Sequence, residues 1–146
     1  MTQNDLINSL IKALDNISLG DIQKTRDIIA KIESSDFDVS DECTIISEKL
    51  IDLLNNLIEA GDFVVSLSKG DLEIEPPKNN YLISAFKELQ SNLKNLTWQT
   101  YQIAKGDYSQ EIHFLGDFSI AFNSMIESLK QKEKLEKSYC DIAKGT

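Results

Sequence analysis

The sequence has few residues that interrupt helices and no long apolar run. Two prolines and six glycines occur among 146 residues, and the β-branched residues form no alternating strand pattern. This composition favours α-helices. No segment has the ~18–20 apolar residues of a membrane-spanning helix, and the N-terminal MTQNDLINSL lacks a secretory pattern. We therefore predict an all-α protein that is cytoplasmic and is not inserted in a membrane.

Clustered positive charge is also missing from the chain. It carries 15 Lys and Arg against 24 Asp and Glu, which gives a net charge of −9. A protein that binds nucleic acid needs clustered Lys and Arg to neutralise phosphates. The basic concentration at residues 130–137 is interleaved with Glu133 and Glu136, which predicts a solvated helix face. We predict no nucleic-acid partner.

Residue types that carry catalysis or bind metals are scarce and scattered. Cys43 and Cys140 show no CxxC spacing, and the acidic residues form neither an HExxH motif nor a calcium loop. The single histidine, His113, lies in a predicted connector. It is either an exposed loop residue or a pH sensor, since imidazole titrates near neutrality. We predict no catalytic residue, no metal, no cofactor and no enzymatic activity.

Residues 34–42 (SSDFDVSDE) are polar and precede a regular apolar pattern. Such a segment is typical of a turn followed by the first residues of a helix. Either Ser40 or Asp41 is the predicted capping residue, because short oxygen-bearing side chains accept hydrogen bonds from the first free backbone N–H groups of a helix.

A repeat of 36 residues is the strongest positive signal in the chain. LSKGDL at 67–72 recurs as IAKGDY at 103–108, and the same offset carries SAFKELQSNLK at 84–94 onto IAFNSMIESLK at 120–130. A diverged third copy begins with IESSDF at 32–37. Self-similarity at a fixed period is the signature of tandem supersecondary units.

Apolar residues follow this repeat at alternating spacings of four and three, and we call them the seam residues. Before the two Gly-Asp pairs they are Leu53, Leu57, Ala60, Val64 and Leu67, and then Leu89, Leu93, Leu96, Thr100 and Ile103. In the helices that follow a break they are Ile46, Leu50, Leu53 and Leu57, then Leu82, Phe86, Leu89 and Leu93, then Phe118, Phe122, Met125 and Leu129. This alternation indicates helices that pack knobs into holes.

Each copy therefore reads as a helix, a Gly-Asp break, an extended connector and a second helix. The glycines allow a positive φ at the helix end, and Pro76-Pro77 forces an extended segment in the middle connector. Leu89 and Leu93 belong to the seams of two consecutive copies. We therefore predict one continuous helix over about 81–105 that consecutive units share.

Residues 96–129 resemble a HAMP domain, the two-helix signalling element of bacterial sensor kinases and chemoreceptors. The matching features are an amphipathic helix, the Gly106-Asp107 break, a short connector, and then Asp117, Phe122-Asn123 and Met125 on a second helix. The resemblance implies a parallel homodimer in which two helices from each chain form a four-helix bundle. It also implies signal transfer by small rotations or tilts between alternative packings of that bundle.

The longer stretch from FVVSLSKGDLEIEPP (63–77) through residue 129 resembles the tandem cytoplasmic HAMP-like region of Gram-positive bacterial signalling proteins. The predicted architecture is all-α, an elongated bundle of tandem helix–connector–helix units that forms a parallel dimeric four-helix coiled coil. Its predicted segments are an N-terminal helical region with the start of a degenerate unit (1–44, with Ser35-Asp36 in place of Gly-Asp), two HAMP-like units (45–95 and 89–135), and a helical tail (136–146).

The predicted function is non-catalytic signal relay through bundle packing in a bacterial sensory pathway. The alternative is a stand-alone adaptor that forms mixed bundles with homologous signalling proteins carrying output domains. The residues predicted to carry the relay are mechanical: the break residues Gly70, Asp71, Gly106 and Asp107, and the seam residues Phe86, Phe122, Met125 and Leu129.

Overall fold

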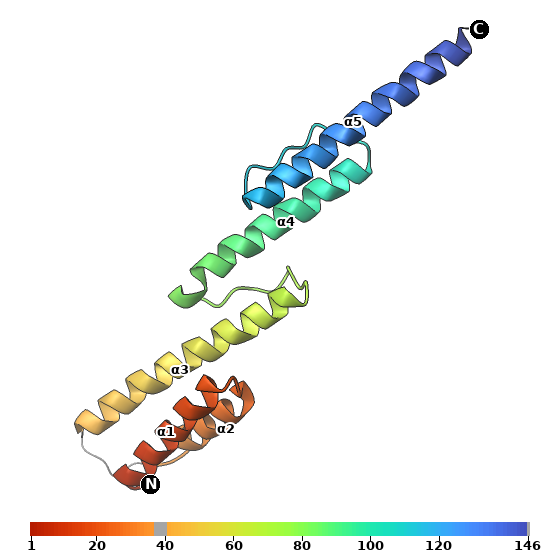
Figure 1. Cartoon of the computed structure of the whole chain (residues 1–146). Coiled ribbons are helices and arrows are strands. Elements are labelled where there is room, and N and C mark those ends of the chain that lie inside the picture. The colour runs from red at the N-terminus through yellow and green to blue at the C-terminus, as the bar shows by residue number, and fades with distance from the viewer. Residues whose placement is uncertain (37–40, 146) are drawn as a thin grey trace. The chain divides into compact units, whose positions relative to one another are not determined.

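The computed structural model describes residues 1–36 and 41–145 (Figure 1). Within these ranges the chain is all-α, with five α-helices, one short 3-10 helix and no strand, which confirms the predicted class. None of the described helices is long and apolar enough to cross a membrane. The chain forms two compact units, Met1–Phe86 and Lys87–Thr146.

The first unit begins with three helices: α1 (Gln3–Ser18), α2 (Ile22–Glu33) and α3 (Asp41–Ser68). Thr2 starts α1 through a capping box, because its hydroxyl accepts from Asp5 N while the Asp5 carboxylate accepts from Thr2 N. The predicted cap Ser40 lies outside the described residues, and α3 begins at the other predicted capping residue, Asp41.

Helices α1 and α2 form a hairpin that packs on α3 between Cys43 and Asp62 (Figure 1). Near the start of α3, Cys43 packs against a cluster of Leu6, Leu10 and Ile32. Further along α3, the cluster consists of Ala13, Ile29, Leu54 and Ile58. Residue numbers on α1 therefore rise along α3 and those on α2 fall. Helix α1 runs parallel to α3, and α2 runs antiparallel to both.

The α2–α3 contact is close at one point. A Cβ atom on Gly61 would lie 2.9 Å from Ile22 Cδ1, so glycine leaves room for the isoleucine. One residue later, Asp62 pairs with the Arg26 guanidinium of α2. These contacts fix which flank of α3 the second helix covers.

The second half of α3 packs against the chain that follows it. Phe63 and Leu67 form a buried cluster with Ile83, and Leu72 and Ile74 of the connector pack against this cluster. The chain then enters a 3-10 turn η1 (Tyr81–Ile83) and helix α4 (Ser84–Ala104). The predicted continuous helix over about 81–105 is confirmed, with its first turn wound as a 3-10 helix.

The second unit contains most of α4, a second connector and α5 (Asp117–Lys144). Its buried residues are Gln90, Ile103, Ile112 and Ile126. Burial follows the 36-residue repeat: Leu54, Gln90 and Ile126 are equivalent by that offset and are 0%, 6% and 2% exposed, and Leu67 and Ile103 form another buried equivalent pair. The repeat in the sequence is thus a repeat of inward-facing positions.

Candidate functional site

The two predicted Gly-Asp breaks end their helices in the same way. Gly70 has φ +83° and Gly106 has φ +91°. At the second break Gly106 N donates to Ile103 O at 2.9 Å and Asp107 N donates to Gln102 O at 3.0 Å; the first break repeats both bonds at 2.9 and 3.1 Å. This pair of bonds is the Schellman motif, which satisfies the last carbonyls of a helix and requires a left-handed residue.

The aspartates of the breaks then organise the first residues of each connector. Asp71 Oδ1 accepts from Glu73 N at 3.2 Å. Asp107 Oδ1 accepts from the backbone N (3.0 Å) and the hydroxyl (2.5 Å) of Ser109, and its Oδ2 accepts from Gln110 Nε2 at 2.7 Å. The Ser109 hydroxyl first, and then the Ser109 N–H and Gln110, hold the pKa of Asp107 below its usual value. The charged carboxylate thus braces the start of this connector.

A side-chain amide on α5 clamps the second connector. Asn123 Oδ1 accepts from Ile112 N at 2.9 Å, and Asn123 Nδ2 donates to Ile112 O at 2.8 Å. The same segment is held from α4, where Gln99 Nε2 donates to Glu111 O at 3.2 Å. Because both backbone groups of Ile112 are satisfied, its side chain can be buried at 1% exposure. The connector is thereby tied to both helices of the second unit.

A related clamp holds the first connector. Asn80 is buried, its Nδ2 donates to Asn56 O of α3 at 2.7 Å, and its Oδ1 accepts from Leu82 N at 3.2 Å. One amide therefore both anchors the end of the connector on α3 and starts the next helical segment. Neither asparagine was assigned this role from the sequence, because their partners are backbone groups 24 and 11 residues away in the chain.

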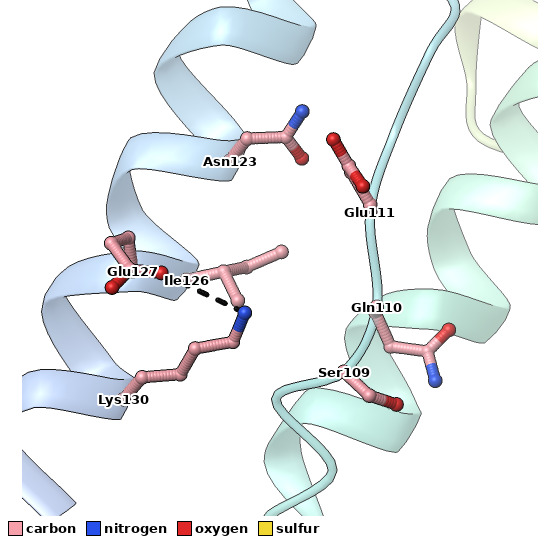
Figure 2. A pocket seen from close by; sticks show the side chains of 7 residues that line it. All are labelled: Ser109, Gln110, Glu111, Asn123, Ile126, Glu127 and Lys130. Atoms are coloured by element: carbon pink, nitrogen blue, oxygen red, sulfur yellow. Dashed lines mark ion pairs between the residues drawn. The ribbon is translucent and has the colours of Figure 1, made fainter.

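A shallow polar pocket of about 200 Å³ lies beside the Asn123 clamp (Figure 2). Its lining residues come from the connector and α5: Ser109, Gln110, Glu111, Asn123, Ile126, Glu127 and Lys130. Lys130 Nζ lies 3.7 Å from Glu127 Oε2, so the single cation here faces a carboxylate of its own helix. No group of three or more His, Cys, Asp or Glu side chains in the described ranges is arranged to hold a metal ion.

The four predicted seam residues lie along helix faces, apart from the breaks. Phe86, at the end of the first unit, is 37% exposed, and Met125 on α5 is 45% exposed. Phe122 and Leu129 are half-buried, and the Phe122 ring stacks on Phe118 with centroids 6.0 Å apart. Thus the eight predicted residues divide into helix-ending turns and exposed or half-buried positions on helix faces, and they do not converge on one site.

Exposure of the seam extends to all three long helices. The exposed large seam residues are Ile46, Leu53 and Leu57 on α3, Leu82, Phe86 and Leu89 at and after η1, and Phe118 and Met125 on α5. Several residues that bury within the chain, such as Leu54 and Ile126, lie one position after a seam residue, whereas the seam residues Leu67 and Ile103, next to the breaks, are themselves buried. Each long helix therefore has one apolar strip used inside the chain and a neighbouring strip left at its surface.

Sequence inspection missed a third Gly-Asp break. Gly20 has φ +79°, Gly20 N donates to Ile17 O at 3.0 Å, and Asp21 N donates to Asn16 O at 2.9 Å. The signal was present in the sequence as LGDI at 19–22. It was overlooked because Gly20 does not fit the 36-residue offset, which pointed instead to Ser35-Asp36.

Comparisons with models of protein families, with curated proteins and with solved structures returned no match. The function is therefore inferred from the residues and their geometry.

Replacing Gly106 with alanine should lower the free energy of unfolding by about 1–2 kcal/mol, because an L-residue is strained at this positive φ. Gly106→Asn is the matched variant, and it should cost less because asparagine tolerates the left-handed region better. Urea denaturation followed by circular dichroism measures both. Equal stability of the alanine variant and the wild type would contradict a required left-handed turn.

Replacing Asn123 with alanine should release the second connector, because Ile112 N and O lose their partners. A buried backbone group left without a partner costs about 1–3 kcal/mol. Hydrogen exchange of the Ile112 amide should accelerate in this variant. Asn95→Ala, an exposed asparagine on α4, is the control and should leave that amide unchanged. An unaltered Ile112 exchange rate in Asn123→Ala would refute the clamp.

Proposed function

We propose that this chain is a non-catalytic signal-transduction module of a bacterial sensory pathway. In this proposal, HAMP-like helix–connector–helix units pair with those of a second chain in a parallel four-helix bundle, and a change in packing at one unit alters the packing of the next. The observation that carries the proposal is the exposed apolar seam, which recurs at the same heptad positions on α3, α4 and α5.

The seam supports a dimer for a physical reason. Residues such as Leu53 and Met125 are 49% and 45% exposed although their heptad spacing matches buried coiled-coil positions. A contiguous apolar strip on a soluble surface marks an interaction site. On α4, residues Leu96, Thr97, Thr100 and Tyr101 line an open hollow of about 380 Å³, which a helix of a second chain can fill.

The relay proposal is supported by the way the connectors are held. Asn80 and Asn123 fix each connector to a helix by backbone hydrogen bonds, so the connector follows that helix when it turns. Helix α4 belongs to both units by residue range, starting at Ser84 in the first and continuing in the second. A rotation of α4 therefore changes the contacts that its first residues make in the first unit and those that its remaining residues make in the second. Small helix shifts of this kind are established switching movements in proteins.

Substituting Met125 with glutamate should weaken self-association at least about tenfold, because burying an unpaired carboxylate at a helix–helix contact is costly. Ile120→Glu on the same helix is the control, since Ile120 is 67% exposed and lies off the seam; it should associate as the wild type does. Analytical ultracentrifugation over a range of concentrations measures both. A wild-type chain that stays monomeric at every concentration would contradict the dimer and, with it, the proposed relay.

Shortening a seam side chain in the first unit should change the backbone dynamics of the second unit. Leu53→Ala removes apolar surface from the seam of α3 and so weakens its packing against the second copy. Because the relay passes this change along the bundle, hydrogen exchange of the backbone amides in the first half of α5 should change. Ile45→Ala, at a 56% exposed position off the seam, should leave those amides unchanged. The measurement is made at a concentration where every variant is fully associated. Exchange changes confined to residues 1–86 would show that the units pack independently.

A further inference from the structure

Helix α1 lies outside the 36-residue repeat, yet it ends as α3 and α4 end. Each of the three helices stops at a left-handed glycine, and the two Schellman bonds have matching lengths at all three sites. A further bond joins the residue after the aspartate to the glycine carbonyl each time, at 3.1, 3.0 and 3.2 Å. The three breaks are thus one local structure used three times.

The apolar positions of α1 also have the same phase relative to the break. Counting back from the glycine, residues 3, 6, 10 and 13 positions earlier are apolar in α1 and carry the seam in α3 and α4. In the three helices they are Ile17, Leu14, Leu10 and Ile7; Leu67, Val64, Ala60 and Leu57; and Ile103, Thr100, Leu96 and Leu93. Helix α1 therefore has the pattern of a first helix of a unit.

The topology around α1 supports the same assignment. Helix α1 runs parallel to α3, and α2, which connects them in the chain, runs antiparallel to both. The extended connectors likewise return along the helix that they follow. A helical return needs more residues, because a helix rises about 1.5 Å per residue and an extended chain about 3.3 Å. This accounts for part of the wider spacing of the breaks, since Gly20 and Gly70 are 50 residues apart and Gly70 and Gly106 are 36 apart. The remainder comes from α3, which has 28 residues against 3 in η1 and 21 in α4.

Four exposed apolar residues lie on one side of the α1–α3 pair. Ile7 and Leu14 each follow by one residue a buried position of α1, Leu6 and Ala13, and they are 40% and 37% exposed. One residue turns the direction of a side chain by about 100° on a helix.

On α3 these exposed apolar residues come one position before a buried residue, whereas on α1 they come one position after it. Ile46 and Leu53 each precede by one residue a buried position, Ser47 and Leu54, and they are 66% and 49% exposed. When two parallel helices face each other, a side chain one position after the buried face of one helix and a side chain one position before the buried face of the other point to the same side of the pair. Because Gly61 and Asp62 place α2 on the other flank of α3, this side is the one that α2 leaves uncovered.

We infer that α1, α2 and α3 form an additional helix–connector–helix unit, with α2 as its connector, and that Ile7, Leu14, Ile46 and Leu53 form a surface for a second copy of this chain. The inference rests on the proposed function and extends its interface to the N-terminal helix. A second copy is the occupant that fits, because the surface repeats in phase with the seams of the later units. A parallel two-fold axis then sets each unit against its own equivalent.

Opposite charges placed at Ile7 test this surface directly. Ile7→Glu and Ile7→Lys each bring like charges together across the two-fold axis, so each should self-associate at least about tenfold more weakly than the wild type. An equimolar mixture of the two should regain wild-type association, because each mixed pair joins opposite charges. Analytical ultracentrifugation provides the readout, and circular dichroism verifies that both variants keep their helix content. Leu19→Glu, at an 83% exposed position beyond α1, is the control and should associate normally.

The outcomes separate this inference from the proposed function. If Met125→Glu weakens association but Ile7→Glu and Ile7→Lys do not, the second-copy surface on α1 is wrong and the relay dimer stands. If both Ile7 variants weaken but their mixture does not recover, Ile7 does not face its equivalent and the inference is again wrong. If the wild type is monomeric, both proposals fail. The pair Leu14→Glu and Leu14→Lys repeats the test at the second α1 position if either Ile7 variant loses helix content.

Discussion

Helix α1 packs parallel to α3, so the chain has to travel back along α1 before α3 begins, and the Gly-Asp break makes this return possible. A helix that ends in a left-handed glycine reverses direction within two residues while its last carbonyls remain hydrogen-bonded. Gly20, Gly70 and Gly106 all do so. The hydrogen bond that the aspartate then accepts differs with the kind of segment that leaves the break. Asp21 accepts from Lys24 N and starts a helix, whereas Asp71 and Asp107 accept from the residue two positions on and start an extended segment.

A returning segment leaves backbone groups to be satisfied, and side-chain amides meet this need. An extended segment that has no neighbouring strand cannot form sheet hydrogen bonds, and a buried N–H or C=O group without a partner is costly. Asn123 pairs with both groups of Ile112, and Asn80 binds a helix carbonyl. Helix α2 solves the same problem internally, since a helix satisfies its own backbone. Each returning segment, whether an extended connector or α2, is therefore held by hydrogen bonds, and the apolar side chains of these segments can pack inward.

The sequence was sufficient to predict what local chemistry determines. The all-α class, the breaks at Gly70 and Gly106 and the helix over about 81–105 follow from glycine, proline and heptad spacing. It was insufficient for the faces that bury within the chain. Leu54 and Ile126 lie one residue after a seam position, and no periodicity distinguishes which of two adjacent apolar strips meets the same chain. The clamps formed by Asn80 and Asn123 depend on partners brought close only by the fold, so no local pattern announces them.

The two units differ in what holds them together inside one chain. The first buries Leu54 and Phe63 at 0% and 1% exposure and adds the whole α1–α2 hairpin. In the second unit, the residues equivalent to Leu54 and Phe63 by the 36-residue offset are Gln90 and Gln99. Burying a leucine or phenylalanine stabilises a fold by about 1.5–3 kcal/mol, whereas an amide must be hydrogen-bonded merely to avoid a cost. The second unit therefore gains less from its own chain. It depends more on hydrogen bonds such as those of Asn123, and in the proposed dimer its exposed seam gains more from a second copy.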